Sequence, residues 1–249
     1  MKKFSSIVIT GASSGIGEAL ALDYAGPGVA LALSGRDAGR LEAVAAACRA
    51  KGATVVADTV DVVDRDKLGP WLSAFDDAHP VDLVIANAGI SIDKSNSSLD
   101  DFSVIRKTFD VNVGGVLNTV EPLLPRMMAR KRGQIAVVAS LASFIGLPYS
   151  ASYNASKAAV RVWGESIRYV LQKDGIGVSV ICPGFVVSRM TANAPFPMPF
   201  LMTAERASAI IRHGLAHNHA RIAFPIGTKA AVWFGQSLPG RWTSRLLGA

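Results

Sequence analysis

The stretch TGASSGIG, residues 10 to 17, lies between an apolar segment, SIVIT, and an alanine- and leucine-rich segment, GEALALDYA. The β-branched residues of SIVIT predict a strand, and the second segment predicts a helix. Gly11, Gly15 and Gly17 allow a tight turn between them and let a pyrophosphate approach the backbone amides at the helix N-terminus. The stretch therefore predicts a dinucleotide-binding unit.

The same alternation continues along the chain. Short apolar runs alternate with longer helical segments, which is typical of a parallel sheet covered by helices on both faces. The strand candidates are residues 6–10, 29–34, 53–60, 81–87, 133–140 and 177–184. No internal repeat, low-complexity tract or linker marks a second domain. We expect an α/β fold, a single doubly wound Rossmann-type domain over residues 1–249.

The composition is that of a globular chain. Hydrophobic residues make up 50% and charged residues 18% of the 249 residues, which excludes a disordered protein. The net charge of +7 suits nucleic acid, a membrane surface or an anionic small molecule, and does not choose among them. The densest basic run, residues 126–132, is expected at a helix C-terminus. Because no nucleic-acid motif accompanies it, we expect no nucleic-acid partner.

Cysteine usage and the N-terminus bear on location. Cys48 and Cys182 lie far apart without metal-ligand spacing, which favours a reducing compartment. Glycines from Gly11 onward interrupt the first apolar run before a signal-peptide core is complete. No uninterrupted apolar run has the length of a spanning helix. We therefore expect a cytoplasmic protein.

The end of the second strand candidate distinguishes between cofactors. It reads LSGR, with Arg36 where NAD sites often carry an acidic residue, and with no carboxylate at Ser34 or Gly35. A guanidinium can hold a 2′-phosphate by charge-assisted hydrogen bonds, and Ser13 of the glycine-rich turn is placed to assist. The sequence favours NADP(H) as the cofactor.

The stretch YNASK, residues 153 to 157, places a phenol four residues ahead of an ammonium group. In a helix, residues i and i+4 share one face. A cation beside a tyrosine favours the phenolate and lowers a pKa that is ordinarily about 10. Such a tyrosine, with Lys157 lowering its pKa, can exchange protons near neutral pH. The alternative is an ordinary exposed helix turn, which is the more common meaning of such a pair taken alone, so the rest of the chain decides between the two.

The chain resembles the classical short-chain dehydrogenase/reductase family over roughly residues 5 to 190, through motifs in family order: TGASSGIG, Asp61, NAG (87–89), Asn112, Ser140, YNASK and PG (183–184). The resemblance implies interconversion of a carbonyl and an alcohol, with Tyr153 as general acid or base. It implies that Lys157 also hydrogen-bonds the nicotinamide ribose, and that Ser140 polarises the substrate oxygen. Asn112 is implied to hold a water in a proton relay.

The resemblance also implies a cofactor site and no metal. Asp61 is expected near the adenine, Asn87 and Gly89 along the cofactor trough, and the backbone near Val186 at the carboxamide. The family usually has threonine where this chain has Ser188, so the hydroxyl is kept. The expected cofactor-binding residues are Gly11, Ser13, Ser14, Gly15, Ile16, Gly17, Arg36, Asp61, Val62, Asn87, Ala88, Gly89, Tyr153, Lys157, Pro183, Gly184, Val186 and Ser188.

The substrate and the partners follow less directly. About residues 190–220 stand where the family has its substrate lid, and the first part, MTANAPFPMPFLM, is rich in methionine and phenylalanine. Such side chains form an adaptable apolar wall, which favours a lipophilic substrate; the alternative is packing under the fold or at a subunit contact. The family implies a homodimer or homotetramer formed through the helices after the fourth and fifth strands.

The C-terminal tail, residues 221–249, is atypical. It mixes Trp233, Phe234 and Trp242 with basic residues, which suits a membrane interface, a cover over the substrate cleft or a subunit contact. Interrupting glycines and Pro239 favour packing over peripheral membrane contact. The chain departs from 3-oxoacyl-carrier-protein reductases in two places: the stretch after NAG reads ISIDKSNSS, and the tail lacks the glycine-rich closing strand typical of those enzymes. That activity is therefore kept as the alternative. A non-catalytic NADP-binding regulator is the alternative class, and the presence of both YNASK residues argues against it.

Three histidines, His213, His217 and His219, are close in sequence. No HExxH pattern or carboxylate set accompanies them. A solvated helix end is therefore expected in place of a metal site.

Overall fold

A computed structural model describes residues 2–91, 101–147, 150–192 and 198–228. Its centre is a seven-stranded parallel sheet in the order β3-β2-β1-β4-β5-β6-β7. The strands are β1 (Ser6–Thr10), β2 (Ala30–Ser34), β3 (Thr54–Asp58), β4 (Leu83–Ala86), β5 (Gly133–Val138), β6 (Ile176–Pro183) and β7 (Arg221–Phe224). The strand order reverses between β1 and β4, which is where doubly wound folds bind ligands.

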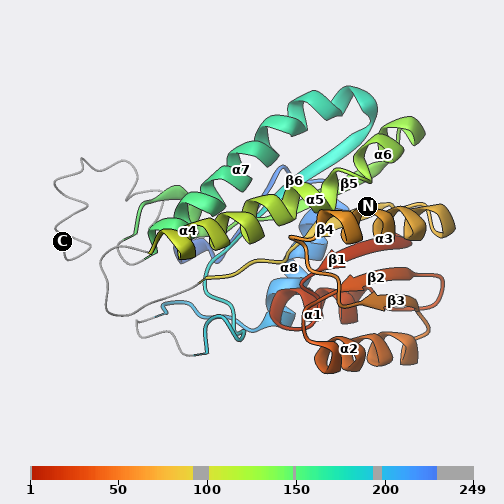
Figure 1. The fold of residues 1–249 in the computed structure, drawn as a ribbon, viewed down its shortest axis with the longest axis horizontal. Helices are drawn as coiled ribbons and strands as arrows, with labels where there is room; N and C mark the ends of the chain where they lie inside the picture. Colours follow the sequence, from red (N-terminus) through yellow and green to blue (C-terminus); the bar gives the residue numbers. More distant parts are fainter. Residues whose placement is uncertain (1, 92–100, 148–149, 193–197, 229–249) are drawn as a thin grey trace.

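Helices cover both faces of the sheet (Figure 1). The α-helices are α1 (Gly15–Tyr24), α2 (Ala38–Ala50), α3 (Arg65–Ala78), α4 (Phe102–Phe109), α5 (Gly115–Val120), α6 (Leu124–Arg130), α7 (Ala151–Leu171) and α8 (Ala204–Ala216). One buried apolar cluster joins the sheet to α1, α2 and α8, through residues such as Leu20, Leu41 and Ile211. The other joins it to the helices on the opposite face, through residues such as Leu72, Val116 and Val160. This arrangement of sheet and helices confirms the predicted α/β fold. The sequence indicated the strands because strands buried on both faces carry continuous apolar runs.

The seventh strand was not predicted. β7 lies within the segment assigned to the C-terminal tail, and it pairs in parallel with β6. RIAF has only four residues and begins with an exposed arginine, so its apolar pattern is too short to identify. The chain therefore has a closing strand that was not predicted, but this strand contains no glycine, so the predicted lack of a glycine-rich closing strand is not contradicted.

The helical segment after β4 is divided. A π-helical turn, η1 (Asp110–Gly114), separates α4 from α5, and α6 begins after a further turn with Pro125 in its first positions. A π-turn widens the helix by one residue, and such turns are frequent at functional sites. Here it places Asn112 with its side chain fully buried.

The basic run ends a helix, as expected. α6 ends at Arg130, and both Arg126 and Arg130 reach across to the buried carboxylate of Asp76 on α3. The two terminal guanidinium nitrogens of Arg130 each donate to one carboxylate oxygen of Asp76, both at 2.7 Å. These two cations therefore join helices.

Candidate active site

The glycine-rich turn connects β1 to α1 as predicted. Gly11 and Gly15 have φ of 66° and 60°, a region that a side chain disfavours. Ser14 is the N-cap of α1, and its side chain makes no capping hydrogen bond. The first amides of α1 are thus left for another acceptor, and a pyrophosphate fits this arrangement.

The turn after β4 is fixed to the turn after β1. The Asn87 side-chain amide donates to the carbonyls of Thr10 (2.9 Å) and Gly11 (3.2 Å). In return, the Thr10 hydroxyl accepts from the backbone amides of Asn87 and Ala88. Thr10 was not predicted as a site residue. Two signals pointed to it, its place at a strand end and its place as the first residue of TGASSGIG.

Gly89 lets the NAG turn pass close to two buried side chains. A β-carbon on Gly89 would lie 3.1 Å from both the Asn112 Oδ1 and the Lys157 Nζ. The NAG turn therefore passes close to two of the predicted catalytic side chains. This close approach lies after β4, at the strand-order reversal between β1 and β4.

The segments after β2 and β3 carry the predicted adenosine-side residues. Arg36 is exposed just beyond β2. Gly35 lets the chain pass close to the glycine-rich turn, because a β-carbon at this position would lie only 2.9 Å from the Ser13 side chain. Asp61 lies three residues beyond the end of β3, where its carboxylate accepts from the Val63 amide at 3.1 Å.

The segment after β6 returns to the glycine-rich turn. A β-carbon on Gly15 would approach the Ser188 Cβ to 3.0 Å. Val186 forms an isolated parallel bridge with Met202, and the Ser188 amide donates to the Thr191 hydroxyl at 3.0 Å. At the start of the segment, the Gly184 amide, next to Pro183, donates to the Phe224 carbonyl at 2.7 Å. The predicted residues of PGFVVS thus line the same edge of the sheet.

Lys157 is held inside the protein by α7. Its side chain is buried and its Nζ donates to the Val138 carbonyl at the end of β5, at 2.8 Å. Burial lowers the pKa of Lys157 to about 8. An ammonium group with this pKa can lose its proton in mildly alkaline solution.

The pKa of Tyr153 differs from the sequence prediction. Burial raises it above the ordinary value, and a hydrogen bond with the Ser140 hydroxyl is what lowers it. The Lys157 Nζ lies 5.9 Å from the centroid of the Tyr153 ring and is directed to the Val138 carbonyl. The two residues share a helix face as predicted, but the predicted lowering of the Tyr153 pKa by Lys157 is not found.

Asn112 uses its whole side chain for hydrogen bonds. Its Oδ1 accepts from the Ile90 amide at 2.8 Å, and its Nδ2 donates to the Ile90 carbonyl and the Ser156 hydroxyl, both at 3.0 Å. Ser156 in turn donates to the Tyr153 carbonyl at 2.8 Å. Ser156 therefore links η1 to the catalytic turn of α7, a role that its place inside YNASK did not reveal.

Ser140 begins a short 3₁₀ helix, η2 (Leu141–Phe144), as its N-cap. Its Oγ accepts from the Ala142 amide at 3.1 Å. Ser140, Tyr153 and Lys157 therefore meet at the carboxyl edge of the sheet, beside Gly89 and Asn112.

Two predicted regions extend beyond the described residues. In the lid, residues 193–197 are outside them, and Val187, Met190, Phe200 and Leu201 are exposed apolar residues of the parts that are described. The tail from residue 229, with Trp233, Phe234 and Trp242, also lies outside the described residues.

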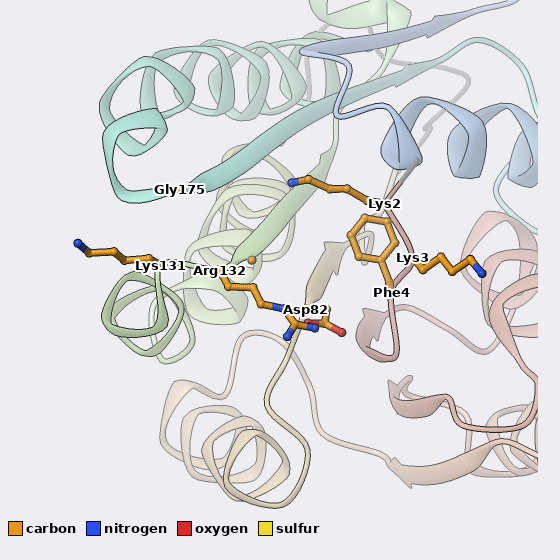
Figure 2. A pocket seen from close by; sticks show the side chains of 8 residues that line it. Lys2, Lys3, Phe4, Asp82, Lys131, Arg132 and Gly175 are labelled. Atoms are coloured by element: carbon orange, nitrogen blue, oxygen red, sulfur yellow. The ribbon is translucent and has the colours of Figure 1, made fainter.

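A charged hollow lies at the opposite edge of the sheet (Figure 2). It has a volume of about 280 Å³ and is lined by Lys2, Lys3, Phe4, Asp82, Lys131, Arg132, Gly133 and Gly175. These residues lie at the starts of β1, β4, β5 and β6, so the hollow is separate from the candidate active site. Arg132 pairs there with Asp82 at 2.6 Å.

The histidines lie at the exposed end of α8, as expected. The rings of His213 and His217 have centroids 4.4 Å apart. Over the described residues, no group of three or more His, Cys, Asp or Glu side chains is arranged to hold a metal ion. None of the helices in this part of the chain is long and apolar enough to cross a membrane.

The lowered pKa of Lys157 predicts a pH dependence of stability. Between about pH 8 and the ordinary lysine pKa of 10.5, the unfolded chain keeps a proton that the folded protein has lost. The free energy of unfolding of the wild type, relative to Lys157→Met, should therefore increase as pH rises through this window. Urea unfolding at pH 7, 8, 9 and 10 measures it, and a difference that is independent of pH would contradict the shift.

Comparisons with known proteins agree with this geometry. The family model described as short chain dehydrogenase matches residues 5–196. An uncharacterized oxidoreductase of Myxococcus xanthus is 39% identical over 223 residues, covering 89% of this chain and 88% of that protein. The ketoacyl reductase HetN of Nostoc is 33% identical over 184 residues, covering 73% of this chain and 63% of HetN. A Burkholderia phymatum short-chain dehydrogenase/reductase, solved in complex with NAD, is 26% identical with a TM-score of 0.84, covering 100% of this chain and 97% of that one.

The fold and the gathered Ser140, Tyr153 and Lys157 define a Rossmann-type oxidoreductase. The chain belongs to the short-chain dehydrogenase/reductase family.

Proposed function

We propose that this protein interconverts a lipophilic carbonyl compound and its alcohol with NADP(H). The observation that carries the proposal is the meeting of the Tyr153 and Ser140 hydroxyls and the Lys157 ammonium beside the NAG turn at Gly89. When bound, the nicotinamide supplies the hydride to the carbonyl carbon, or accepts it from the alcohol carbon. The chain has to supply the proton, the polarising donor and the binding surface.

In reduction, the Ser140 hydroxyl donates a hydrogen bond to the substrate oxygen, and Tyr153 gives that oxygen a proton. The raised pKa of Tyr153 keeps the phenol protonated at neutral pH, which suits this direction. In oxidation, the same phenol has to be deprotonated first. Lys157 is expected to contact the ribose and Asn112 to support proton resupply, as in the family.

The glycine-rich turn, the NAG turn and the segment after β6 are proposed to hold the dinucleotide. The observations in favour are the uncapped N-terminus of α1, the positive φ of Gly11 and Gly15 and the close approach of Gly89 to Lys157. The preference for NADP rests on Arg36. Its side chain is exposed just beyond the end of β2, where the guanidinium can contact a 2′-phosphate.

Replacement of Arg36 by Ala should weaken NADPH binding and leave NADH binding nearly unchanged. Loss of one charge-assisted hydrogen bond costs about 1.5–3 kcal/mol, which corresponds to roughly a 10- to 150-fold rise in Kd. Titration of both reduced cofactors by nicotinamide fluorescence measures the change. Arg40→Ala is the matched control, because Arg40 already pairs with Asp37 at 2.8 Å. An unchanged preference in Arg36→Ala would contradict the assignment.

The proposed lipophilic substrate rests on the exposed apolar residues at the lid, Val187, Met190, Phe200 and Leu201. The test is the loss of nicotinamide absorbance with NADPH and NADH, against aliphatic, aromatic and steroidal carbonyls and small polar ones. Turnover should be restricted to, or fastest with, the lipophilic compounds. Turnover of the small polar compounds alone would overturn this substrate class.

A 3-oxoacyl-carrier-protein reductase activity is a second candidate. It is favoured by the similarity to the ketoacyl reductase HetN. Of the two sequence arguments against it, the lack of a glycine-rich closing strand still holds, because β7 contains no glycine. The other, the ISIDKSNSS stretch after NAG, lies largely outside the described residues. A 3-oxoacyl thioester in the substrate panel distinguishes the two. Homo-oligomer formation, a single domain and a cytoplasmic location stay predictions.

A further inference from the structure

The face of α7 that carries Tyr153 and Lys157 continues with two more polar residues. Arg161 and Glu165 follow at the same spacing of four residues, so all four side chains lie along one stripe of the helix. The proposed mechanism uses the first two. Arg161 faces the segment that follows Ser140, and Glu165 pairs with Arg161.

Arg161 makes two contacts with that segment and a third with Glu165 on its own helix. Its guanidinium carbon lies over the Phe144 ring, 4.2 Å from the centroid. One guanidinium nitrogen donates to the Ser143 carbonyl at 3.4 Å, and the other to Glu165 at 3.1 Å. Phe144 and Ser143 are the last two residues of η2, which begins directly after Ser140.

A second arginine completes the arrangement. Arg221, the first residue of β7, also lies over the Phe144 ring, 5.1 Å from its centroid. Its Nε donates to the Glu165 carboxylate at 2.9 Å. We name Phe144, Arg161, Glu165 and Arg221 the Phe144 clamp. Two cations that share one ring and one carboxylate fix the direction of the ring as well as its position.

The Phe144 clamp holds one end of η2, and Ser140 is at the other end. The Ala142 amide within η2 donates to the Ser140 Oγ at 3.1 Å. A shift or rotation of η2 therefore turns the Ser140 hydroxyl relative to Tyr153. Because the clamp binds η2 to the same helix that carries Tyr153, it sets the relative placement of the two hydroxyls.

We propose that Arg161 is a positioning residue, which acts through Phe144 and η2 to hold the Ser140 hydroxyl in place beside Tyr153, where both hydroxyls act on the substrate oxygen. This inference rests on the proposed function, because it concerns the same reaction. Arg161 acts on the reaction only through η2. Its effect should therefore be seen in kcat and in the state of Tyr153, with cofactor affinity unchanged.

A double-mutant cycle tests the inference. Arg161→Gln should lower kcat by about 10- to 100-fold in the wild type, a loss typical of a misplacement by about 1 Å. In a Ser140→Ala background the same change should lower kcat by less than about threefold, because the group that it positions is already gone. Equal losses in both backgrounds, or no loss in the wild type, would overturn the proposal.

Arg168→Gln is the matched control. Arg168 lies on the same helix, and its guanidinium donates to the Val178 carbonyl and, at 3.1 and 2.9 Å, to the side chain and carbonyl of Asn218. These bonds anchor α7 to β6 and to the turn before β7. The change should keep kcat within about threefold of the wild type. A loss in Arg168→Gln as large as in Arg161→Gln would show a general loosening of α7 and would also overturn the proposal.

A second measurement needs no turnover. The chain has four tyrosines, so a protein labelled with ¹³C at tyrosine Cζ gives few signals, and Tyr153→Phe identifies the one from Tyr153. Ser140→Ala should move this signal by removing a hydrogen bond. Arg161→Gln should move it in the same direction and Arg168→Gln should not; an unmoved signal in Arg161→Gln would overturn the inference. If the wild type turns over no carbonyl, the proposed function fails while this measurement still decides the inference.

Discussion

The Tyr153→Phe protein should lose about 10³-fold in kcat, a loss typical of removing a general acid. The phenylalanine ring keeps the packing of the tyrosine, so only the hydroxyl is lost. That hydroxyl bonds to Ser140 within the site, so its loss leaves the surrounding core in place. NADPH affinity and the unfolding temperature should stay close to those of the wild type.

Tyr169→Phe is the matched control for this change. Tyr169 lies on the same helix, and 80% of its surface is exposed, so removal of its hydroxyl should leave kcat unchanged. Steady-state reduction of the best carbonyl from the panel, together with fluorescence titration of NADPH, separates loss of chemistry from loss of binding. If Tyr153→Phe kept kcat within about tenfold of the wild type, Tyr153 would not be the proton donor.

The fold was predictable because five of its strands, β1, β2, β4, β5 and β6, are buried along their whole length. Each of the first six strands lies within the predicted run or differs from it by one residue at an end, since a continuous apolar run between helical segments is typical of a buried parallel strand. β7 was missed because four residues at a sheet edge bury only Ile222 and Phe224. The break at η1 was missed because a π-turn needs one extra residue, which no periodicity reveals.

The structure places Ser140, Tyr153 and Lys157 close together, but their electrostatics could not be read from spacing. The four-residue interval correctly placed Tyr153 and Lys157 on one face. It carried no information on the Val138 carbonyl, which comes from another part of the chain and draws the ammonium away. The sign of the Tyr153 pKa shift is set by burial, a tertiary property. Ser156 and Thr10 were missed for the same reason, because their partners are distant in sequence.

The Gly17→Ala protein should lose both stability and cofactor binding. Gly17 lies in the first turn of α1, and a β-carbon there would be 2.3 Å from the Gly11 carbonyl oxygen and 2.6 Å from the Asn87 Nδ2. The first of these is backbone and cannot move aside without opening the turn between β1 and α1. Overpacking of this kind costs about 3 kcal/mol, which lowers the unfolding temperature by about 6–12 °C in a chain of this size.

Cofactor binding should fall further than stability alone explains, because the same shift displaces the α1 amides and the Asn87 side chain that fixes the NAG turn. We expect a rise of at least about 30-fold in the Kd for NADPH, measured well below the unfolding temperature, since about 2 kcal/mol of binding free energy corresponds to that factor. Gly39→Ala is the control: its β-carbon would meet only the Asp37 Oδ1, at 3.8 Å, and alanine is the better helix former. Its unfolding temperature should be unchanged or slightly raised, with the same NADPH affinity as the wild type. An unaltered Kd in Gly17→Ala would mean that the turn between β1 and α1 does not hold the pyrophosphate.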